Sequence, residues 1–168
     1  MKRITSLLSV FALFVAFTAC AQNQKPSPPA SAEFKAGGAN IRIKYSSPSV
    51  KGREIWGKLV PYGEVWRTGA NEATTFETDK DIKIEGKTLP AGTYSLFTIP
   101  GKDEWVIVFN KTAKQWGAYS YKAADDVLRV TVKPTTSEMT ETLKIEGEEA
   151  SGKVNIRWEK ISVPFKIS

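Results

Sequence analysis

The sequence contains no histidine, and this absence excludes much of the usual catalytic repertoire. Without an imidazole, neither a Ser-His-Asp triad nor a Cys-His pair can form, and histidine-based zinc and copper sites are excluded as well. Cysteine is nearly as scarce, because Cys20 is the only one in 168 residues. One cysteine allows no intrachain disulfide, so the fold has to be stable through its core alone.

Three further absences argue against a nucleotide cofactor, a calcium site and a nucleic-acid partner. The glycines at positions 52, 57 and 63 lack the spacing of a P-loop or a dinucleotide-binding loop, so no cofactor is predicted. The acidic residues at 79–81 and 125–126 supply too few oxygens for calcium, so turns and no metal site are predicted there. The net charge of +6 becomes +4 when Lys2 and Arg3 are removed, and the remaining charges alternate with apolar residues. This pattern predicts no nucleic-acid partner.

The first residues have the layout of an export signal. Residues 1–3 are basic, and residues 4–17 are mostly apolar but too short for a comfortable membrane span. Small residues follow directly before Cys20, which resembles the bacterial lipobox. We therefore predict a signal peptide of the lipoprotein type over residues 1–19 and a lipid on Cys20.

The alternative is an ordinary signal peptide that is cleaved after Ala19 or Ala21. A lipid on Cys20, however, accounts for an unpaired thiol in an exported protein and makes the membrane a partner through an N-terminal anchor. Ala21 stands where an acidic residue often retains bacterial lipoproteins in the inner membrane. The predicted location is therefore the cell envelope, as an outer-membrane lipoprotein that faces the periplasm or the exterior.

The residues after Cys20 are polar and rich in proline, with prolines at 26, 28 and 29. Such composition is typical of a tether and not of a packed core. We predict that residues 20–38 comprise the lipidated cysteine and a flexible linker, and that residues 39–168 form one folded domain.

From residue 40 onward, apolar and polar residues alternate with a period of two, and turn residues separate the alternating segments. Residues 105–109 are apolar on both faces, as in a central strand that is covered on each side. Residues 51–57 and 64–68 are predicted to be short strands as well. The pattern predicts an all-β domain of about nine or ten short strands, an antiparallel β-sandwich of the jelly-roll or immunoglobulin-like kind.

Residues 62–76 hold more side chains capable of chemistry than any other stretch. Gly69 and Asn71 tolerate positive φ, so a tight turn or bulge is predicted between two strand segments. Arg67 and Glu72 flank this turn, and a structural ion pair between them is the first interpretation. A ligand clamp is the second.

The candidate ligand-binding residues are Trp66, Arg67, Asn71, Glu72 and Tyr94. Aromatic rings stack on sugars and on other planar or apolar ligands, while Arg, Asn and Glu fix the orientation of the ligand. Because Val65 and Trp66 are adjacent, one faces away from the other, and the pattern leaves open whether Trp66 is buried or exposed. The predicted partner is a glycan or an envelope protein.

Two functions remain for this stretch. The residues favour a non-catalytic binding or structural module, with no catalytic residue assigned. The alternative is a glycan-directed hydrolase that uses the carboxylates of Glu72 and Glu64, because a pair of carboxylates about 5–9 Å apart can hydrolyse a glycosidic bond. Whether the protein is an enzyme stays open, with the balance toward no catalysis.

Four long motifs resemble one bacterial family. They are PYGEVWRTGANEATT at residues 61–75, LPAGTYSLFTIP at 89–100, EWVIVFN at 104–110 and YKAADDVLRV at 121–130. Together they resemble the family called domain of unknown function 2911, over nearly the whole predicted domain. The resemblance implies a β-rich domain that is exported or lipid-anchored. It implies no activity.

Overall fold

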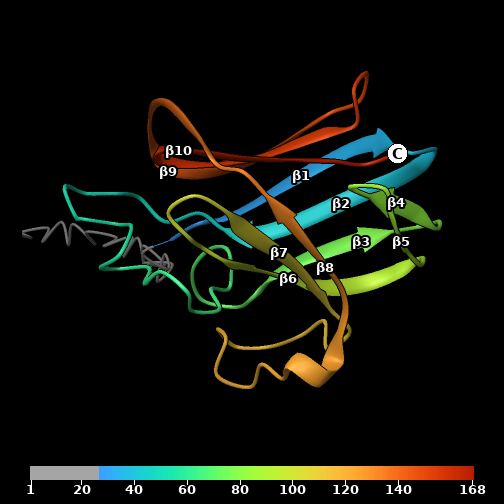
Figure 1. The fold of residues 1–168 in the computed structure, drawn as a ribbon, viewed down its shortest axis with the longest axis horizontal. Coiled ribbons are helices and arrows are strands. Elements are labelled where there is room, and N and C mark those ends of the chain that lie inside the picture. The colour runs from blue at the N-terminus through green and yellow to red at the C-terminus, as the bar shows by residue number, and fades with distance from the viewer. Residues whose placement is uncertain (1–26) are drawn as a thin grey trace, which may run out of the picture.

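The computed structural model describes residues 27–168, and within them the chain is all-β, with antiparallel sheets and a single short 3₁₀ turn at Ala123–Asp125 (Figure 1). This confirms the predicted fold class. The strands are β1 (Pro29–Ala36), β2 (Ala39–Ser46), β3 (Thr74–Thr78), β4 (Ile82–Ile84), β5 (Lys87–Leu89), β6 (Gly92–Ile99), β7 (Trp105–Asn110), β8 (Asp126–Val132), β9 (Thr135–Glu148) and β10 (Lys153–Lys166). In residues 27–168, no helix has the length and hydropathy needed to cross a membrane.

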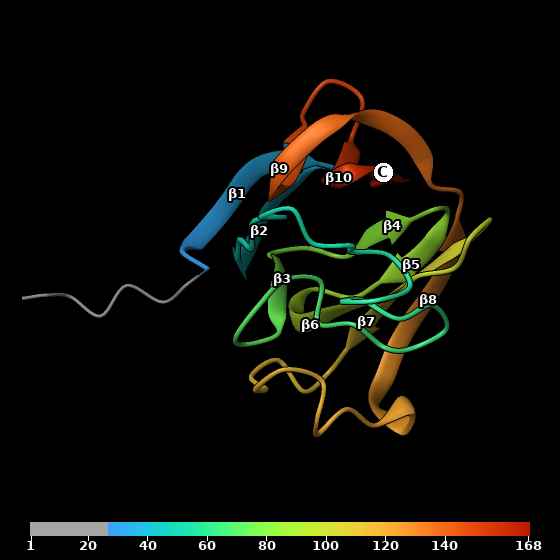
Figure 2. The same ribbon diagram turned by 90° about the vertical axis from the view of Figure 1, so that its left-hand side faces the viewer.

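The strands form a large sheet and two small ones. Six strands pair in the order β1-β2-β3-β6-β7-β8, and β9 pairs with β10 in a separate layer. Figure 2 shows that β9 and β10 cover one side of the six-stranded sheet. The hairpin of β4 and β5 joins the end of β10 through the pairing of Ile84 with Ile167. The result is a two-layer sandwich of unequal sheets.

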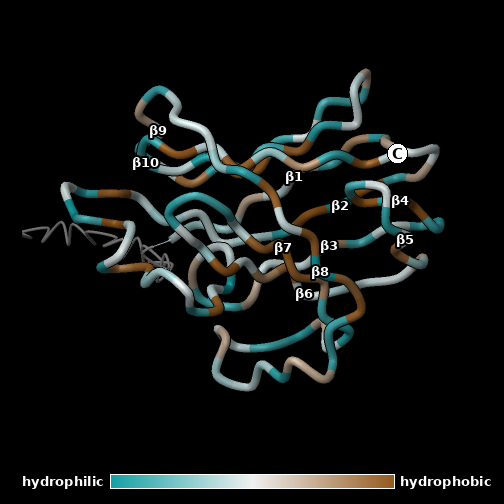
Figure 3. The backbone as a smooth tube through the Cα atoms, viewed as in Figure 1, coloured by the Kyte–Doolittle hydropathy of each residue, from teal (hydrophilic) through white to brown (hydrophobic). Residues whose placement is uncertain are grey.

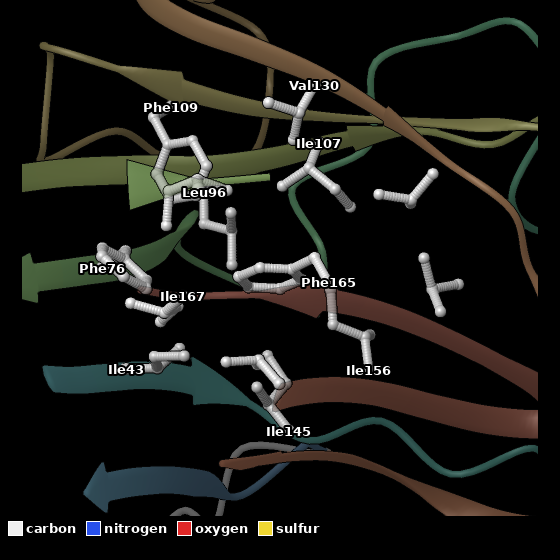
Figure 4. Packing of buried hydrophobic residues seen from close by; sticks show 14 of the residues in the cluster. Ile43, Phe76, Leu96, Ile107, Phe109, Val130, Ile145, Ile156, Phe165 and Ile167 are labelled. Carbon is white, nitrogen blue, oxygen red and sulfur yellow. The ribbon is translucent and has the colours of Figure 1, made fainter. Parts of the chain in front are cut away.

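The main core lies between these two layers, and period-two alternation builds it. In β2, Ile41 and Ile43 are buried while Arg42 and Lys44 are exposed, and Ile43 is paired with the buried Phe76 of β3. Figure 3 shows the same alternation as hydrophobic residues recurring along the strands. In Figure 4, side chains of the six-stranded sheet such as Phe109 face Phe165 and its neighbours from the β9–β10 layer.

β7 is buried on both faces, as predicted for residues 105–109. Ile107 and Phe109 belong to the main core, while Val108 points to the outer face of the sheet. There it joins Phe97 and Ala73 in a second, smaller hydrophobic cluster. Residues 111–122, named here the Trp116 loop, supply part of the cover over this cluster. In Figures 1 and 2 the loop lies on the side of the sheet opposite to β9 and β10.

The linker predicted for residues 20–38 is wrong in its second half. Pro29–Ala36 forms strand β1, which pairs with β2 in continuous register from Pro29↔Ser46 to Ala36↔Ala39. Phe34 and Ala36 are buried there, so the segment has an apolar face despite its polar composition. Proline is tolerated because β1 is an edge strand and Pro29 is its first residue. The predicted signal peptide, Cys20 and the first part of the linker lie outside the described residues.

Two predictions about strands also need correction. Residues 51–57 form turns with one isolated bridge between Trp56 and Val60, not a regular strand. β9 and β10 are not short, since each has 14 residues. Their pairing shifts register on both sides of Glu159, whose φ is 54°, so β10 is one long irregular strand.

The packing of β1 on β9 leads to a testable prediction. A Cβ added at Gly147 of β9 would overlap the ring of Phe34 in β1. We expect Gly147→Ala to lower the free energy of unfolding by about 1–3 kcal/mol through overpacking. Phe34→Ala alone should cost about 3–5 kcal/mol as a large-to-small core change. In the Phe34→Ala background, Gly147→Ala should cost almost nothing, because the clash is gone.

Urea unfolding of the four chains measures this coupling. Glu148→Ala, an exposed neighbour on the same strand, serves as the control and should change the free energy of unfolding by less than about 0.5 kcal/mol. Equal costs of Gly147→Ala in both backgrounds would mean that residues 29–36 do not pack on β9.

Candidate ligand-binding site

The predicted turn within residues 62–76 interrupts the segment that is hydrogen-bonded to β6. Trp66 exchanges two backbone hydrogen bonds with Thr98 of β6, at 2.8 and 2.9 Å. The amide of Thr74, the first residue of β3, then donates to the carbonyl of Arg67 at 3.1 Å. Residues 68–73, named here the central loop, therefore leave the sheet and return to the same place. The predicted interruption is confirmed, although residues 64–68 contribute one bridge and not a full strand.

The backbone of the central loop is strained at a buried threonine. Thr68 has a φ of 55° and is fully buried, a rare conformation for a β-branched residue. Its carbonyl accepts a hydrogen bond from Thr74 Oγ1 at 2.7 Å, and its own Oγ1 lies 3.1 Å from Thr98 Oγ1. These buried hydrogen bonds hold the strained conformation.

Asn71 has the positive φ that the sequence predicts, at 58°, but Gly69 does not. Glycine is needed at position 69 for space instead, because a Cβ there would lie 2.8 Å from the carbonyl oxygen of Ser46. The turn is therefore packed against β2 and does not project freely into solvent.

Trp66 belongs to the core. Its ring stacks on that of Trp158 with centroids 5.7 Å apart and an interplanar angle of 14°, and it meets Trp56 and Trp105 edge to face. Its Nε1 donates to the carbonyl of Gly69 at 3.1 Å. This half-buried ring closes the main core at one end, so it is not an exposed platform for a ligand.

Arg67 and Glu72 do not form the predicted pair: the ion pairs between described residues do not join them. The Nε of Arg67 is buried, and no residue in the described range accepts a hydrogen bond from it. A Cβ added at Gly117 would lie 2.8 Å from Arg67 Nη1 and 3.0 Å from the ring of Tyr119. Arg67 thus lies against the Trp116 loop, while Glu72 is exposed.

The Trp116 loop pairs with the central loop. Gly117 donates its amide to the carbonyl of Asn71 at 3.1 Å, and Ala73 donates to the carbonyl of Gln115 at 2.9 Å. These bonds bring Trp116 beside Glu72. Trp116 is 57 % exposed and Tyr119 is 83 % exposed, the two largest exposures among the described large hydrophobic residues.

The sequence holds a signal for these two rings, although they are not among the predicted site residues. Both lie in the irregular stretch after β7, where no alternation assigns a side chain to a core face. An aromatic residue in a region without a strand period has no predicted core position. Such rings are the better candidates for exposed contacts.

A polar network anchored on Asp126 holds the Trp116 loop to the sheet. Asp126 accepts hydrogen bonds from Asn110 Nδ2 at 2.8 Å, from the Tyr121 hydroxyl at 2.6 Å and from Arg129 Nε at 2.7 Å. Its side chain is 6 % exposed. Ser95 also donates to the carbonyl of Thr112 at 2.8 Å. Burial, reinforced by Asp126, raises the pKa of Tyr121.

The two loops border two hollows on the outer face of the sheet. One, of about 300 Å³, is lined by Trp116 and Lys114 on one side and by Glu72, Ala73 and Thr75 on the other. The next, of about 240 Å³, is lined by the same three residues and by Pro29, Lys44 and Tyr45. Because the hollows share Glu72, Ala73 and Thr75, they form one shallow groove, named here the Glu72 groove.

Tyr94 is not part of this site. It is buried, its hydroxyl donates to the carbonyl of Pro90 at 2.8 Å, and its ring packs on Phe109 of the main core. Burial, with a contribution from Asp81, raises the pKa of Tyr94. It lies four positions before Thr98 in β6, a distance of about 13 Å along the strand. Glu64 is exposed and lies outside the residues that line the groove.

Another hollow, separate from the Glu72 groove, has a volume of about 460 Å³ and lies along β1, β2 and β3. The charged side chains that line it already have partners within the sheet. Arg42 Nε contacts Glu33 at 2.9 Å, and Asp79 accepts a hydrogen bond from the backbone amide of Asn40 at 2.8 Å. This is the charged outer face of a sheet, so the Glu72 groove is the better candidate. Across the described residues 27–168, acidic and cysteine side chains form no group of three that could hold a metal.

The Asp126 network predicts a dependence on alkaline pH. The pKa of Tyr121 is raised above its ordinary value of about 10, so its contribution to stability is complete below about pH 10. The contribution is lost as the pH rises through the raised value. We expect Tyr121→Phe to lower the free energy of unfolding at pH 7 by about 1 kcal/mol, through the lost hydrogen bond. Above pH 10, the stability of this variant should fall less steeply than that of the parent.

Urea unfolding at neutral and alkaline pH measures both effects. Tyr119→Phe removes a hydroxyl that makes no hydrogen bond within residues 27–168, and it should change neither value. Identical pH profiles for the parent and Tyr121→Phe would contradict the role of Tyr121.

Comparison with known proteins identifies the family but no relative with a described activity. The searches of curated proteins and of solved structures found no match. The family model described as protein of unknown function (DUF2911) matches residues 27–167, which include β1 and both loops of the groove. The resemblance that the four motifs carry is thereby confirmed, and the chain belongs to the DUF2911 family.

Proposed function

We propose that this protein is a non-catalytic binding module of the cell envelope, anchored through a lipid on Cys20, that binds glycans in the Glu72 groove. The observation that carries the proposal is the exposed ring of Trp116, which lines the groove together with Glu72. Exposed rings of this size need an explanation in a domain whose other tryptophans are buried or half-buried.

The side chains at the groove suit a sugar. The indole face of Trp116 offers an apolar surface of the kind on which a sugar ring stacks. Glu72 and Lys114 supply an acceptor and a donor for hydroxyl groups. One hollow, of about 300 Å³, lies at the lower limit for small-ligand pockets, and the other, of about 240 Å³, lies below it. A shallow continuous groove of this kind suits a chain of sugar rings better than one enclosed small molecule.

The same geometry favours binding over the alternative of glycoside hydrolysis. That reaction uses two carboxyl groups that flank the bond, about 5–9 Å apart. Glu72 is the only carboxylate among the described residues that line the groove, and Glu64, its predicted partner, lies elsewhere. We therefore assign Glu72 to ligand orientation.

The glycan proposal is tested by binding of the purified protein to an array of bacterial envelope glycans. We expect Trp116→Ala to weaken binding about tenfold, equivalent to about 1.4 kcal/mol, because it removes the stacking surface. Tyr62→Ala is the matched control, since Tyr62 is 40 % exposed but lies outside the groove. Unchanged binding by Trp116→Ala would refute the proposed surface.

The same glycans distinguish binding from hydrolysis. We expect Glu72→Gln to weaken binding severalfold, while neither this variant nor the parent releases new reducing ends. Release of reducing ends by the parent, abolished in Glu72→Gln, would instead establish the hydrolase.

The lipid anchor is tested by fractionation after a high-salt wash, which screens charge contacts but leaves a lipid anchor in place. We expect the parent to stay with the membrane and Cys20→Ser to move to the soluble envelope fraction. Ala21→Ser, the neighbouring change, should stay with the membrane. If Cys20→Ser also stayed there after the wash, the lipid anchor would be ruled out.

A further inference from the structure

The chain enters the folded domain at the rim of the Glu72 groove. The carbonyl of Ser27 accepts a hydrogen bond from Asn71 Nδ2 at 3.3 Å, and Asn71 also accepts from Gly117 beside Trp116. The carbonyl of Pro28 accepts from the amide of Ser47 at 2.8 Å, and Pro29 lines the groove itself. The entry point of the chain and the candidate site therefore occupy the same side of the domain.

The distance between Cys20 and this entry point is short. Ser27 is the seventh residue after Cys20, so the link between them consists of seven Cα-to-Cα steps. Fully extended, they span at most about 25 Å. A domain of this size has a radius of gyration of about 14 Å, so its far side lies roughly 40 Å beyond its near side. A lipid on Cys20 would therefore keep the groove on the side of the domain that faces the membrane.

The charges around the groove indicate what kind of ligand it takes. Lys44 lines one hollow and Lys114 lines the other, and both are exposed. Among the described residues, neither forms an ion pair. Glu72 lies between them. Two cations that flank an apolar ring and a central carboxylate complement a sugar that carries anionic groups at its ends.

We propose that the Glu72 groove binds the anionic sugar headgroup of a glycolipid in the same membrane that holds the lipid anchor. The inference rests on the proposed glycan binding and adds the source and the charge of the ligand. The sugar stacks on Trp116, Glu72 accepts hydrogen bonds from its hydroxyls, and Lys44 and Lys114 contact its phosphate or carboxylate groups. The short tether raises the local concentration of such headgroups around the groove.

The test uses the full chain with Cys20→Ser, so that any attachment to lipid comes from the groove. Flotation is measured with vesicles of phosphatidylethanolamine and phosphatidylglycerol, with and without lipopolysaccharide, whose inner sugars carry phosphate. Purified cell-wall sacculi, which present glycan without a lipid, are the second probe.

We expect the protein to float with the lipopolysaccharide vesicles and not with the plain vesicles, and not to sediment with sacculi. Lys44→Gln and Lys114→Gln should each lower the affinity about fivefold, the equivalent of ~1 kcal/mol per cation near an anionic surface. Lys58→Gln, an exposed lysine outside the groove, should leave the affinity unchanged. Urea unfolding checks that each lysine variant is folded.

The outcomes separate this inference from the proposed function. Binding to sacculi or to neutral envelope glycans, without binding to lipopolysaccharide vesicles, would overturn the glycolipid inference and leave the glycan-binding function intact. Equal flotation with plain vesicles would overturn the inference as well, because the surface would then respond to membrane charge and not to sugar. Failure to bind any glycan or vesicle would overturn both.

Discussion

The structure depends on a sheet that has to be covered on both faces. Strand β7 places Ile107 and Phe109 on one side and Val108 on the other, and all three are fully buried. The β9–β10 layer covers the first side. The second side cannot be left to water, so the chain covers it with the central loop and the Trp116 loop over a small cluster formed by Ala73, Phe97 and Val108. The candidate groove is a consequence of this arrangement, because the cover stops short of β2.

The central loop arises because two separate segments of the chain pair with β6. Trp66 pairs with Thr98, while Thr74 resumes the ladder opposite Leu96. The six residues of the central loop, 68–73, include a buried threonine with positive φ, a conformation that costs of order 1–3 kcal/mol. Hydrogen bonds to Thr74 and Thr98 offset this cost. The strain has a structural result: it directs Asn71 and Glu72 outward, where they meet the Trp116 loop.

The sequence predicts the fold well because alternation is a local property. In β2 the order of Ile41, Arg42, Ile43 and Lys44 already states which side chains are buried. β1 escapes the same reasoning, since Phe34 is its only large apolar residue and its polar and proline content outweighs the weaker alternation of alanines. Its strand character comes from pairing with β2 and from the space that Gly147 leaves for Phe34, and neither is visible in residues 29–36 alone.

The candidate site is predicted only in part. The physical reason is that both faces of the six-stranded sheet are covered, one by the β9–β10 layer and the other by the two loops. Glu72 lines the groove, as its turn position suggests, and Asn71 pairs with the Trp116 loop beside it. Trp66 and Tyr94, in contrast, are core residues, and Arg67 lies beneath the Trp116 loop. A functional-looking residue that lies within the pairing of a doubly covered sheet is buried whichever way it points. Exposed rings have to come from the covering loops.

This reasoning also explains why the N-terminal segment and the groove occupy one place. β1 is the edge of the six-stranded sheet beside β2, which is the side where the outer cover is missing. The chain that leads into β1 therefore passes the uncovered part of the sheet, and its carbonyl groups find partners there in Asn71 and Ser47. An edge strand with unpaired backbone groups is exposed to unwanted pairing, and proline at its start limits that risk. The position of residues 27–29 beside the groove thus follows from the topology of the sheet, so any ligand that the groove binds is held next to the start of β1.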